Sequence, residues 1–223
     1  MKNNKIGIYS TIGPTSLNKK FLSFAKNKVS LLRLNMSHID LKNLKGQIQT
    51  IRKFSNIPIC IDTEGAQIRT KYNLKKKFKI WKNIKILKIK KRNFLSLYPD
   101  NVFELLKTKD ILSIGFEGLK LKILNKNEKF INAKCIQQGT LENNKGVSVD
   151  NRFIKLNPLT KKDLECIKIG KKLSIKYFAL SFTNSINDIR YFNKLIPKAY
   201  KIFKIESKMA IKNLNEIMKG GKE

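Results

Sequence analysis

Residues 57–63 read IPICIDT, a short apolar run that ends in two polar residues. Two similar apolar runs precede it, IGIYSTIG at residues 6–13 and VSLLRLN at residues 29–35. Apolar residues at helical spacing lie between the runs, over residues 16–27 and 40–54. The order strand, helix, strand, helix, strand is typical of parallel βα units, so the fold class is α/β.

Two polar residues stand at the predicted helix starts. Ser16 and Asp40 each precede a helical pattern, and a side-chain oxygen at that position can accept a hydrogen bond from a free backbone N–H group. We therefore expect both residues to be N-caps.

The middle of the chain has a different pattern. Short alternating segments broken by Asn and Gly extend from about residue 71 to 151 and predict a small inserted β domain. The βα rhythm then returns. The predicted division is residues 1–70 and 152–223 for the βα domain and residues 71–151 for the insertion. The later elements are a helix over 160–171, a strand over 175–182, a helix over 185–195, a strand over 199–206 and a last helix that ends near residue 218.

The chain is strongly basic, with 48 Lys+Arg against 16 Asp+Glu and a formal net charge of +32. Such a charge raises the possibility of a nucleic-acid partner. Arginine, which is preferred for bidentate phosphate contacts, makes up only six of the 48, while Lys, Ile and Asn are abundant together. Because these three residues have AT-rich codons, we favour a compositional bias and do not expect a nucleic-acid partner. In the densest stretch, Tyr72 to Phe94, we expect half-buried strands with a lysine-coated outer face.

Composition also bears on cellular location. No apolar run approaches the roughly 20 residues of a membrane-spanning helix, and the first residues lack the features of a secretory signal. We therefore expect a cytoplasmic protein with no membrane partner. Cys60, Cys135 and Cys166 are too few and too far apart for a disulfide framework or a zinc site.

Polar residues follow three of the predicted strands. In parallel βα folds the reactive residues lie just past the carboxyl ends of the strands. These positions hold residues 33–38, 62–69 and 204–206, with arginines suited to phosphate, oxygen donors suited to Mg²⁺ or K⁺, and a lysine beside a carboxylate. Such groups are the components of a phosphoryl-transfer site. Each of these groups, taken alone, has a simpler explanation. Arg33 could be a surface residue, Asp62-Thr63 could form a turn, and Lys204 could be one lysine among many.

The order of these motifs resembles the pyruvate kinase family. The matching stretches are TIGPTS at residues 11–16, RLNMSH at 33–38, DTEGAQIRT at 62–70, KGV at 145–147, and LTKKD at 159–163 with ALSF at 179–182 and KIE at 204–206. The resemblance implies a TIM (β/α)8-type barrel with an inserted β lid domain. It also implies transfer of the phosphoryl group of phosphoenolpyruvate to ADP, giving pyruvate and ATP in glycolysis, with Mg²⁺ and K⁺ as cofactors.

The resemblance also implies roles for individual residues. Arg33 would contact phosphate and substrate, and Lys204 would stabilise the transferring phosphoryl group and the enolate. The nucleotide would contact Asn35, Ser37, His38, Arg69 and Lys145. Glu206 would hold Mg²⁺, and Asn35, Ser37, Asp62 and Thr63 would hold K⁺.

Several positions depart from the family pattern. In the family motif DTKGPEIR, this chain has Glu64 for the lysine, Ala66 for the proline and Gln67 for the glutamate. The lid motif Asp-Asp-Gly-Leu appears as FEGL at residues 116–119, and Asn184 replaces an arginine. The charge at the cation site and the lid are therefore the parts of the resemblance that are least well matched.

Chain length sets a further expectation. A complete barrel takes about 250 residues, and the residues outside the insertion provide only about four to five of eight βα units. We expect an incomplete barrel that is truncated after about the fifth strand and lacks the family's second metal carboxylate. The alternatives are an inactive fragment, a split barrel completed by a second chain, a homo-oligomer, a lysine-rich nucleic-acid-binding module, and a lyase or aldolase on the same kind of barrel.

Overall fold

The computed structural model describes residues 6–115 and 118–221. Phe116 and Glu117, the first two residues of the predicted lid motif, lie outside the described residues. The chain forms two compact units. Residues 1–66 and 157–223 make up the first unit, and residues 67–156 make up the second.

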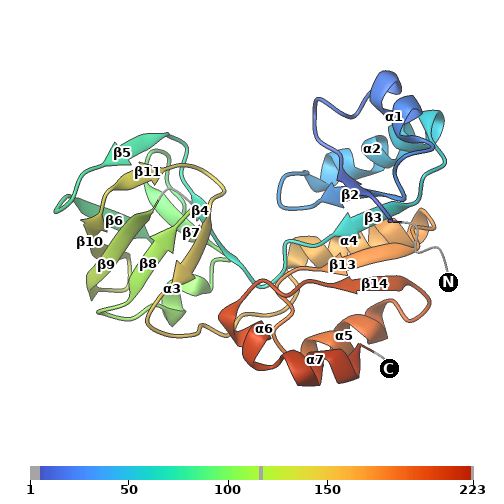
Figure 1. The fold of residues 1–223 in the computed structure, drawn as a ribbon. Coiled ribbons are helices and arrows are strands. Elements are labelled where there is room, and N and C mark those ends of the chain that lie inside the picture. The colour runs from blue at the N-terminus through green and yellow to red at the C-terminus, as the bar shows by residue number, and fades with distance from the viewer. Residues whose placement is uncertain (1–5, 116–117, 222–223) are drawn as a thin grey trace. The chain divides into compact units, whose positions relative to one another are not determined.

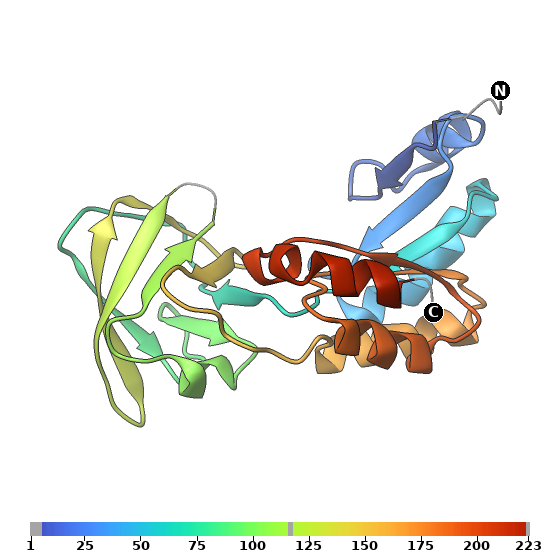
Figure 2. The same cartoon turned by 60° about the horizontal axis from the view of Figure 1, so that its bottom comes forward.

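The first unit is built on parallel strands joined by helices (Figures 1 and 2). Its described residues form a five-stranded sheet in the order β1-β2-β3-β13-β14, and every pair of neighbours is parallel. The α/β class and the incomplete barrel are therefore confirmed. The elements are β1 (Tyr9–Thr11), α1 (Lys19–Ala25), β2 (Leu31–Asn35), α2 (Leu41–Phe54), β3 (Ile59–Asp62), α4 (Lys161–Lys172), β13 (Tyr177–Leu180), α5 (Ile186–Leu195), β14 (Tyr200–Phe203), α6 (Lys208–Lys212) and α7 (Leu214–Gly220).

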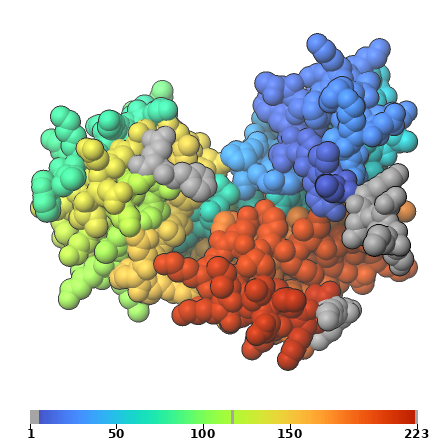
Figure 3. Space-filling view, in the orientation of Figure 1, coloured from blue at the N-terminus to red at the C-terminus, as the bar shows by residue number. Residues whose placement is uncertain are grey.

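The main core of this unit lies between the sheet and its helices. Buried residues of α1, α2, α4 and α5 pack against alternate residues of the strands, among them Leu32, Ile61 and Phe178. The C-terminal helices α5, α6 and α7 share a smaller buried cluster of Ile189, Ala210 and Ile217. The C-terminal part of the chain, red in Figure 3, forms part of the surface in that view. Because the strand residues between these positions point away from the helices, the other face of the sheet is available for a site.

The helix starts correct one of the sequence predictions. Asn18, not Ser16, is the N-cap of α1, and its side chain accepts a hydrogen bond from the Phe21 N–H group. The Ser16 hydroxyl accepts instead from the Gly13 N–H group at 2.9 Å. Ser16 and Asn18 are both good cap residues, and because Ser16 is bonded within the turn at Gly13, Asn18 caps the helix. Asp40 stands at the N-cap of α2 without a side-chain cap bond.

The second unit is a β barrel. Over its described residues, seven strands close in the order β10-β6-β7-β4-β12-β8-β9, and β5 and β11 form a separate pair. Its apolar core is made by alternate strand residues. The elements are β4 (Ile68–Lys71), β5 (Lys76–Phe78), β6 (Asn83–Leu87), β7 (Leu95–Tyr98), α3 (Val102–Leu105), β8 (Ile111–Ile114), β9 (Leu119–Lys126), β10 (Phe130–Gln137), β11 (Gly139–Leu141) and β12 (Gly146–Val149).

The lysine-rich stretch of this unit has the expected alternation. Ile84 and Ile86 of β6 are buried in the barrel, and Lys85 between them is exposed. The predicted strand with a lysine-coated outer face is confirmed here.

Candidate active site

Asp62 is the centre of a charged cluster in the first unit. It is the last residue of β3, and its side chain is only 1% exposed. Its Oδ2 atom accepts a hydrogen bond from Arg33 Nε at 2.7 Å and another from Lys204 Nζ at 3.1 Å. A buried carboxylate therefore holds two cations in fixed positions at the carboxyl edge of the sheet, where the sequence predicted the site.

The cluster lies on the sheet face opposite the helices. Arg33 and Asn35 are two residues apart on β2 and so share a face, and Asn35 is in register with Asp62 on the neighbouring strand. Parallel strands align their carboxyl ends, so residues far apart in the chain meet at this edge.

Two hydroxyl groups complete the cluster, and sequence reasoning gave neither a role. Thr11, at the end of β1, accepts from Arg33 Nη1 at 3.1 Å. Ser181, directly after β13, is 3% exposed and its Oγ lies 2.7 Å from the Thr63 carbonyl oxygen and 3.1 Å from Asp62 Oδ1. Both residues lie at strand ends, so the rule that selected Arg33 and Asp62 could have found them.

Cys60 lies next to this cluster on β3. Burial raises the pKa of its thiol to about 12, Asp62 adds to the increase, and Arg33 and Lys204 oppose it. The raised pKa favours the protonated thiol, which is typical of a buried structural cysteine.

The predicted K⁺ ligands fit a monovalent cation in their chemistry. The Asn35 and Ser37 side chains, the Asp62 carboxylate and Thr63 each offer an oxygen atom, the type of ligand that hard cations prefer. Arg33 and Lys204 both contact Oδ2 of Asp62, whereas Oδ1 accepts a hydrogen bond from the neutral Ser181 hydroxyl. The Oδ1 side of the carboxylate thus suits a cation better than the Oδ2 side.

The described residues fit a divalent metal less well than they fit a monovalent cation. Glu206 accepts a hydrogen bond from the Phe182 N–H group at 3.1 Å, and its other oxygen lies 3.4 Å from Lys204 Nζ. Phe182 has a φ of 52°, an uncommon value for a residue with a side chain. Over residues 6–115 and 118–221, no group of three His, Cys, Asp or Glu residues could hold a metal ion. Within this part of the chain, Glu206 therefore offers Mg²⁺ one carboxylate at most.

The remaining predicted residues lie in two places. His38 is exposed in the first unit, in the turn after β2. Arg69 and Lys145 lie in the second unit, where Gly146, next to Lys145, is in register with Arg69. Arg69 Nη1 donates to the Asn144 carbonyl oxygen at 3.2 Å, and Lys145 Nζ lies 2.8 Å from Glu142 Oε2. The second unit thus has its own pair of cations at the β4–β12 ladder.

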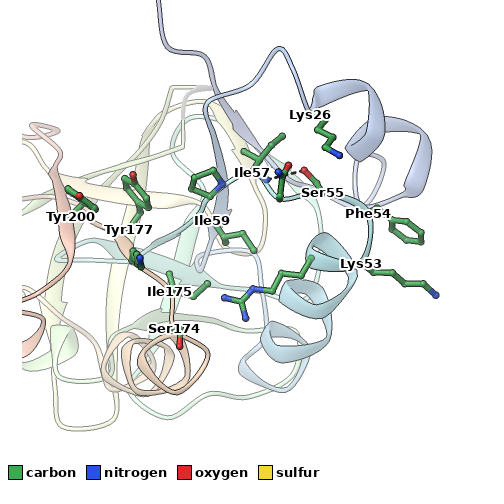
Figure 4. A pocket seen from close by; sticks show the side chains of 14 residues that line it. Lys26, Lys53, Phe54, Ser55, Ile57, Ile59, Ser174, Ile175, Tyr177 and Tyr200 are labelled. Atoms are coloured by element: carbon green, nitrogen blue, oxygen red, sulfur yellow. Dashed lines mark hydrogen bonds between the residues drawn. The ribbon is translucent and has the colours of Figure 1, made fainter.

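A cavity of about 840 Å³ lies at the amino ends of β3 and β13, the opposite edge of the sheet from Asp62. In Figure 4 Tyr177 and Tyr200 lie side by side at one end of it and Phe54 and Lys26 lie at the other; the two tyrosine rings stack at 4.9 Å. The cavity includes none of the predicted site residues.

No described helix combines the length and the apolar character needed to cross a membrane.

Comparison with known proteins identifies the family. Residues 3–222 match the family model "Pyruvate kinase, barrel domain". The chain is 28% identical to a pyruvate kinase of Staphylococcus epidermidis and to one of Staphylococcus haemolyticus, and 27% identical to one of Staphylococcus aureus, each over 232 residues. These alignments cover 96% of this chain and 40% of each relative, so the chain spans about 40% of the length of these relatives. The match over nearly the whole chain shows that it belongs to the pyruvate kinase family.

Proposed function

We propose that the chain is a pyruvate kinase-type phosphotransferase, which moves a phosphoryl group from phosphoenolpyruvate to ADP and forms pyruvate and ATP. Membership of the family supports this proposal. In this reaction the bond from phosphorus to the enol oxygen breaks, a bond forms to a terminal phosphate oxygen of ADP, and the enolate takes up a proton at carbon to become pyruvate.

The observation that carries the proposal is the convergence of Arg33 and Lys204 on Asp62. The two cationic groups are held before any substrate arrives, by contacts of 2.7 and 3.1 Å to one buried oxygen. Positive charge that is fixed in advance stabilises an anionic transition state without reorganisation, and such stabilisation often contributes more to catalysis than any other effect. The pair therefore suits a reaction in which negative charge develops on phosphoryl and enolate oxygens.

Each residue then has a proposed task. Arg33 binds the substrate phosphate, since a guanidinium can donate two parallel hydrogen bonds to it. Lys204 stabilises the phosphoryl group in transfer and the enolate that remains. Asn35, Ser37, Asp62 and Thr63 would hold K⁺, which offsets phosphoryl charge when bound. Glu206 would contribute a carboxylate to Mg²⁺.

Each unit, taken by itself, has residues proposed to contact a nucleotide. In the first unit these are Asn35, the last residue of β2, and Ser37 and His38 in the turn that follows it. Arg69 and Lys145 of the second unit would contact its phosphates. Lys145 is paired with Glu142, so it exchanges that carboxylate for a phosphate when a nucleotide binds.

A coupled assay of pyruvate formation with phosphoenolpyruvate, ADP, Mg²⁺ and K⁺ tests the proposal. Lys204→Met is expected to lower kcat by about 10²-fold or more, because it removes a charge that acts in the transition state. Lys208→Met, at an exposed position four residues later, is the matched control and is expected to keep wild-type activity. Turnover that survives in the Lys204→Met variant would contradict the proposed role.

The open sheet favours a second arrangement of the same function. Among the described strands, β1 pairs with β2 and β14 pairs with β13, which leaves an unpaired edge on each side. Free parallel edges are unfavourable in water and can accept further strands. In this alternative a second polypeptide supplies the remaining βα units. The assay therefore includes an arm with the remainder of a staphylococcal relative's chain added. Turnover only in that arm supports a split barrel, and no turnover in either arm contradicts the proposed function.

A further inference from the structure

The first turn of α4 contacts the loops that directly follow β2 and β3, next to the predicted cation ligands. Lys162 Nζ donates a hydrogen bond to the carbonyl oxygen of Met36 and lies 3.0 Å from Glu64 Oε1. The Lys162 side chain is 23% exposed and that of Glu64 only 8%. A largely buried ion pair therefore ties α4 to the loop after β2 and to the loop after β3.

The peptide unit that Lys162 contacts joins Met36 to Ser37, one of the predicted cation ligands. The Met36 carbonyl group and the Ser37 N–H group belong to one planar peptide. That N–H group donates to Asn35 Oδ1 at 3.0 Å. By holding the oxygen of this peptide, Lys162 fixes the direction of the N–H bond and with it the Asn35 side chain.

The loop after β3 is held by further groups of the same turn. Asp163 Oδ1 accepts from the Glu64 N–H group at 2.7 Å, and Asp163 Oδ2 accepts from the Gly65 N–H group at 3.2 Å. Thr160 Oγ1 donates to Glu64 Oε2 at 3.3 Å. These bonds hold Glu64 in place. The Glu64 carboxylate can therefore fix the position of the Lys162 ammonium group, which also contacts the Met36 carbonyl oxygen.

We propose that Lys162 is a positioning residue for the monovalent cation site, with Glu64 as its anchor. The inference rests on the proposed function, which assigns Asn35, Ser37, Asp62 and Thr63 to that cation. It also explains Glu64, which departs from the family motif. The Glu64 carboxylate pairs with Lys162. Its role is therefore to hold the loops after β2 and β3 in place rather than to add negative charge to the cation site.

Positioning and simple electrostatics predict opposite results when Lys162 is removed. A nearby positive charge repels a bound cation, so loss of the ammonium group alone would tighten cation binding. Loss of the bridge that Lys162 forms between Glu64 and the Met36 carbonyl oxygen would instead free the Met36–Ser37 peptide and weaken cation binding. Outer groups that orient ligands typically affect metal affinity by 10-fold or more.

The test measures binding of Tl⁺, a spectroscopic substitute for K⁺, by ²⁰⁵Tl NMR on the full chain with competition by K⁺ at constant ionic strength. Lys162→Met is expected to weaken Tl⁺ binding about 10-fold. Lys161→Met makes the same change at the exposed neighbouring position and is expected to stay within about twofold of wild type. Unchanged or tighter binding by Lys162→Met overturns the inference, while absence of K⁺-competed binding in the wild type overturns the cation site of the proposed function as well.

A charge swap separates the bridge from the ion pair. The double variant Glu64→Lys with Lys162→Glu keeps opposite charges but presents a carboxylate to the Met36 carbonyl oxygen. We expect its Tl⁺ affinity to stay as low as that of Lys162→Met, and recovery to the wild-type value would overturn the bridging role. Circular dichroism at 222 nm checks that each variant is folded. If Lys162→Met is not, Lys162→Arg replaces it, because it keeps charged donors and is expected to bind Tl⁺ within about threefold of wild type; a larger loss by folded Lys162→Arg overturns the inference.

Discussion

Lys204 Nζ lies 3.1 Å from Asp62 Oδ2, although the strands before these residues are not neighbours in the sheet. β13 lies between β3 and β14, and the residue of β13 in register with Asp62 is Ala179. Ala179 is in register with Ile202, two residues before Lys204 on the same face. Because an alanine side chain is small, the lysine can cross the intervening strand and reach the carboxylate.

Asp62→Asn is expected to destabilise the first unit. The change removes the negative charge that Arg33 and Lys204 share and leaves two cations facing a neutral amide. Removal of one partner of a buried pair costs about 3–5 kcal/mol, and partial exposure of Arg33 (35%) and Lys204 (23%) reduces the expected loss to roughly 2 kcal/mol. Urea unfolding followed at 222 nm measures it.

The signal at 222 nm reports mainly on the first unit, because the second unit's described helix, α3, has four residues. Asp40→Asn, an exposed residue without a side-chain cap bond, is the matched control and is expected to change the free energy of unfolding by less than about 0.5 kcal/mol. Equal effects of the two variants would show that Asp62 is not an energetic centre of this unit.

Glu142→Gln is expected to strengthen binding of ADP. Lys75 and Lys145 lie 2.6 and 2.8 Å from the Glu142 carboxylate, and hydrogen bonds from Lys145 and then Lys75 lower the pKa of Glu142 to about 2. The carboxylate is therefore ionised at neutral pH and competes with phosphate for Lys145. Removal of the carboxylate charge should lower the Kd for ADP roughly threefold in calorimetric titration, because the ion pair is partly exposed (40% for Lys145 and 19% for Glu142) and therefore weak.

Glu128→Gln is the control for this variant, because it removes the same charge from an exposed position of the second unit. It should leave the Kd nearly unchanged. If both variants strengthen ADP binding equally, the effect comes from net charge and not from release of Lys145.

The sequence patterns predicted the secondary structure and the strand-end residues, but few of the contacts between residues far apart in the chain. The apolar runs and helical spacing predicted the βα units, and the strand-end rule selected Arg33, Asp62 and Lys204, which the structure brings together. The predicted start of the first helix was wrong, since Ser16 and Asn18 are both good caps and the choice depends on the Gly13 turn.

The partner of Glu64 shows what a sequence pattern cannot supply. Glu64 appeared only as a departure from the family motif, whereas the structure pairs it with Lys162, 98 residues later. This contact forms because β13 lies beside β3 in the sheet and α4 directly precedes β13 in the chain. The arrangement exists only once the sheet is assembled. Similarly, the contacts of Ser181 with Asp62 and Thr63 join the ends of two strands separated by the whole second unit.

Asp110→Asn is expected to remove a pH-dependent part of the stability of the second unit. Arg152 donates to both oxygens of the buried Asp110, at 2.7 Å from Nε and 2.6 Å from Nη2. Burial raises the pKa of Asp110, but hydrogen bonds from Arg152 and the Lys107 N–H group outweigh it, so the pKa lies below the usual 3.8. A carboxyl with a lowered folded-state pKa stabilises the fold fully above its unfolded pKa and loses that contribution as the pH falls through the folded value.

The measurement is urea unfolding followed by the fluorescence of Trp81, the single tryptophan and a residue of the second unit. At pH 7 Asp110→Asn should cost roughly 2 kcal/mol, less than a fully buried pair because Arg152 is 30% exposed. The difference from wild type should shrink as the pH drops below about 4. Asp100→Asn, at an exposed position, should show no such pH dependence, and a constant difference between Asp110→Asn and wild type from pH 7 to 3 would contradict the assignment.

Gly65→Ala and Gly46→Ala are expected to change the stability of the first unit in opposite directions. Gly65 has a φ of 68° in the loop after β3, and a Cβ there would overlap the carbonyl group of Ser181. The left-handed backbone and the overlap together should cost roughly 2–4 kcal/mol. Gly46 lies inside α2, and apart from its chain neighbours and the nearby helix backbone no atom lies within 4 Å of a Cβ there. Alanine should therefore stabilise the helix by roughly 0.5–1 kcal/mol. Both changes are measured by urea unfolding at 222 nm. A loss of stability in both variants would mean that α2 does not accept a Cβ at position 46, and no loss in Gly65→Ala would mean that the loop after β3 can move away from Ser181.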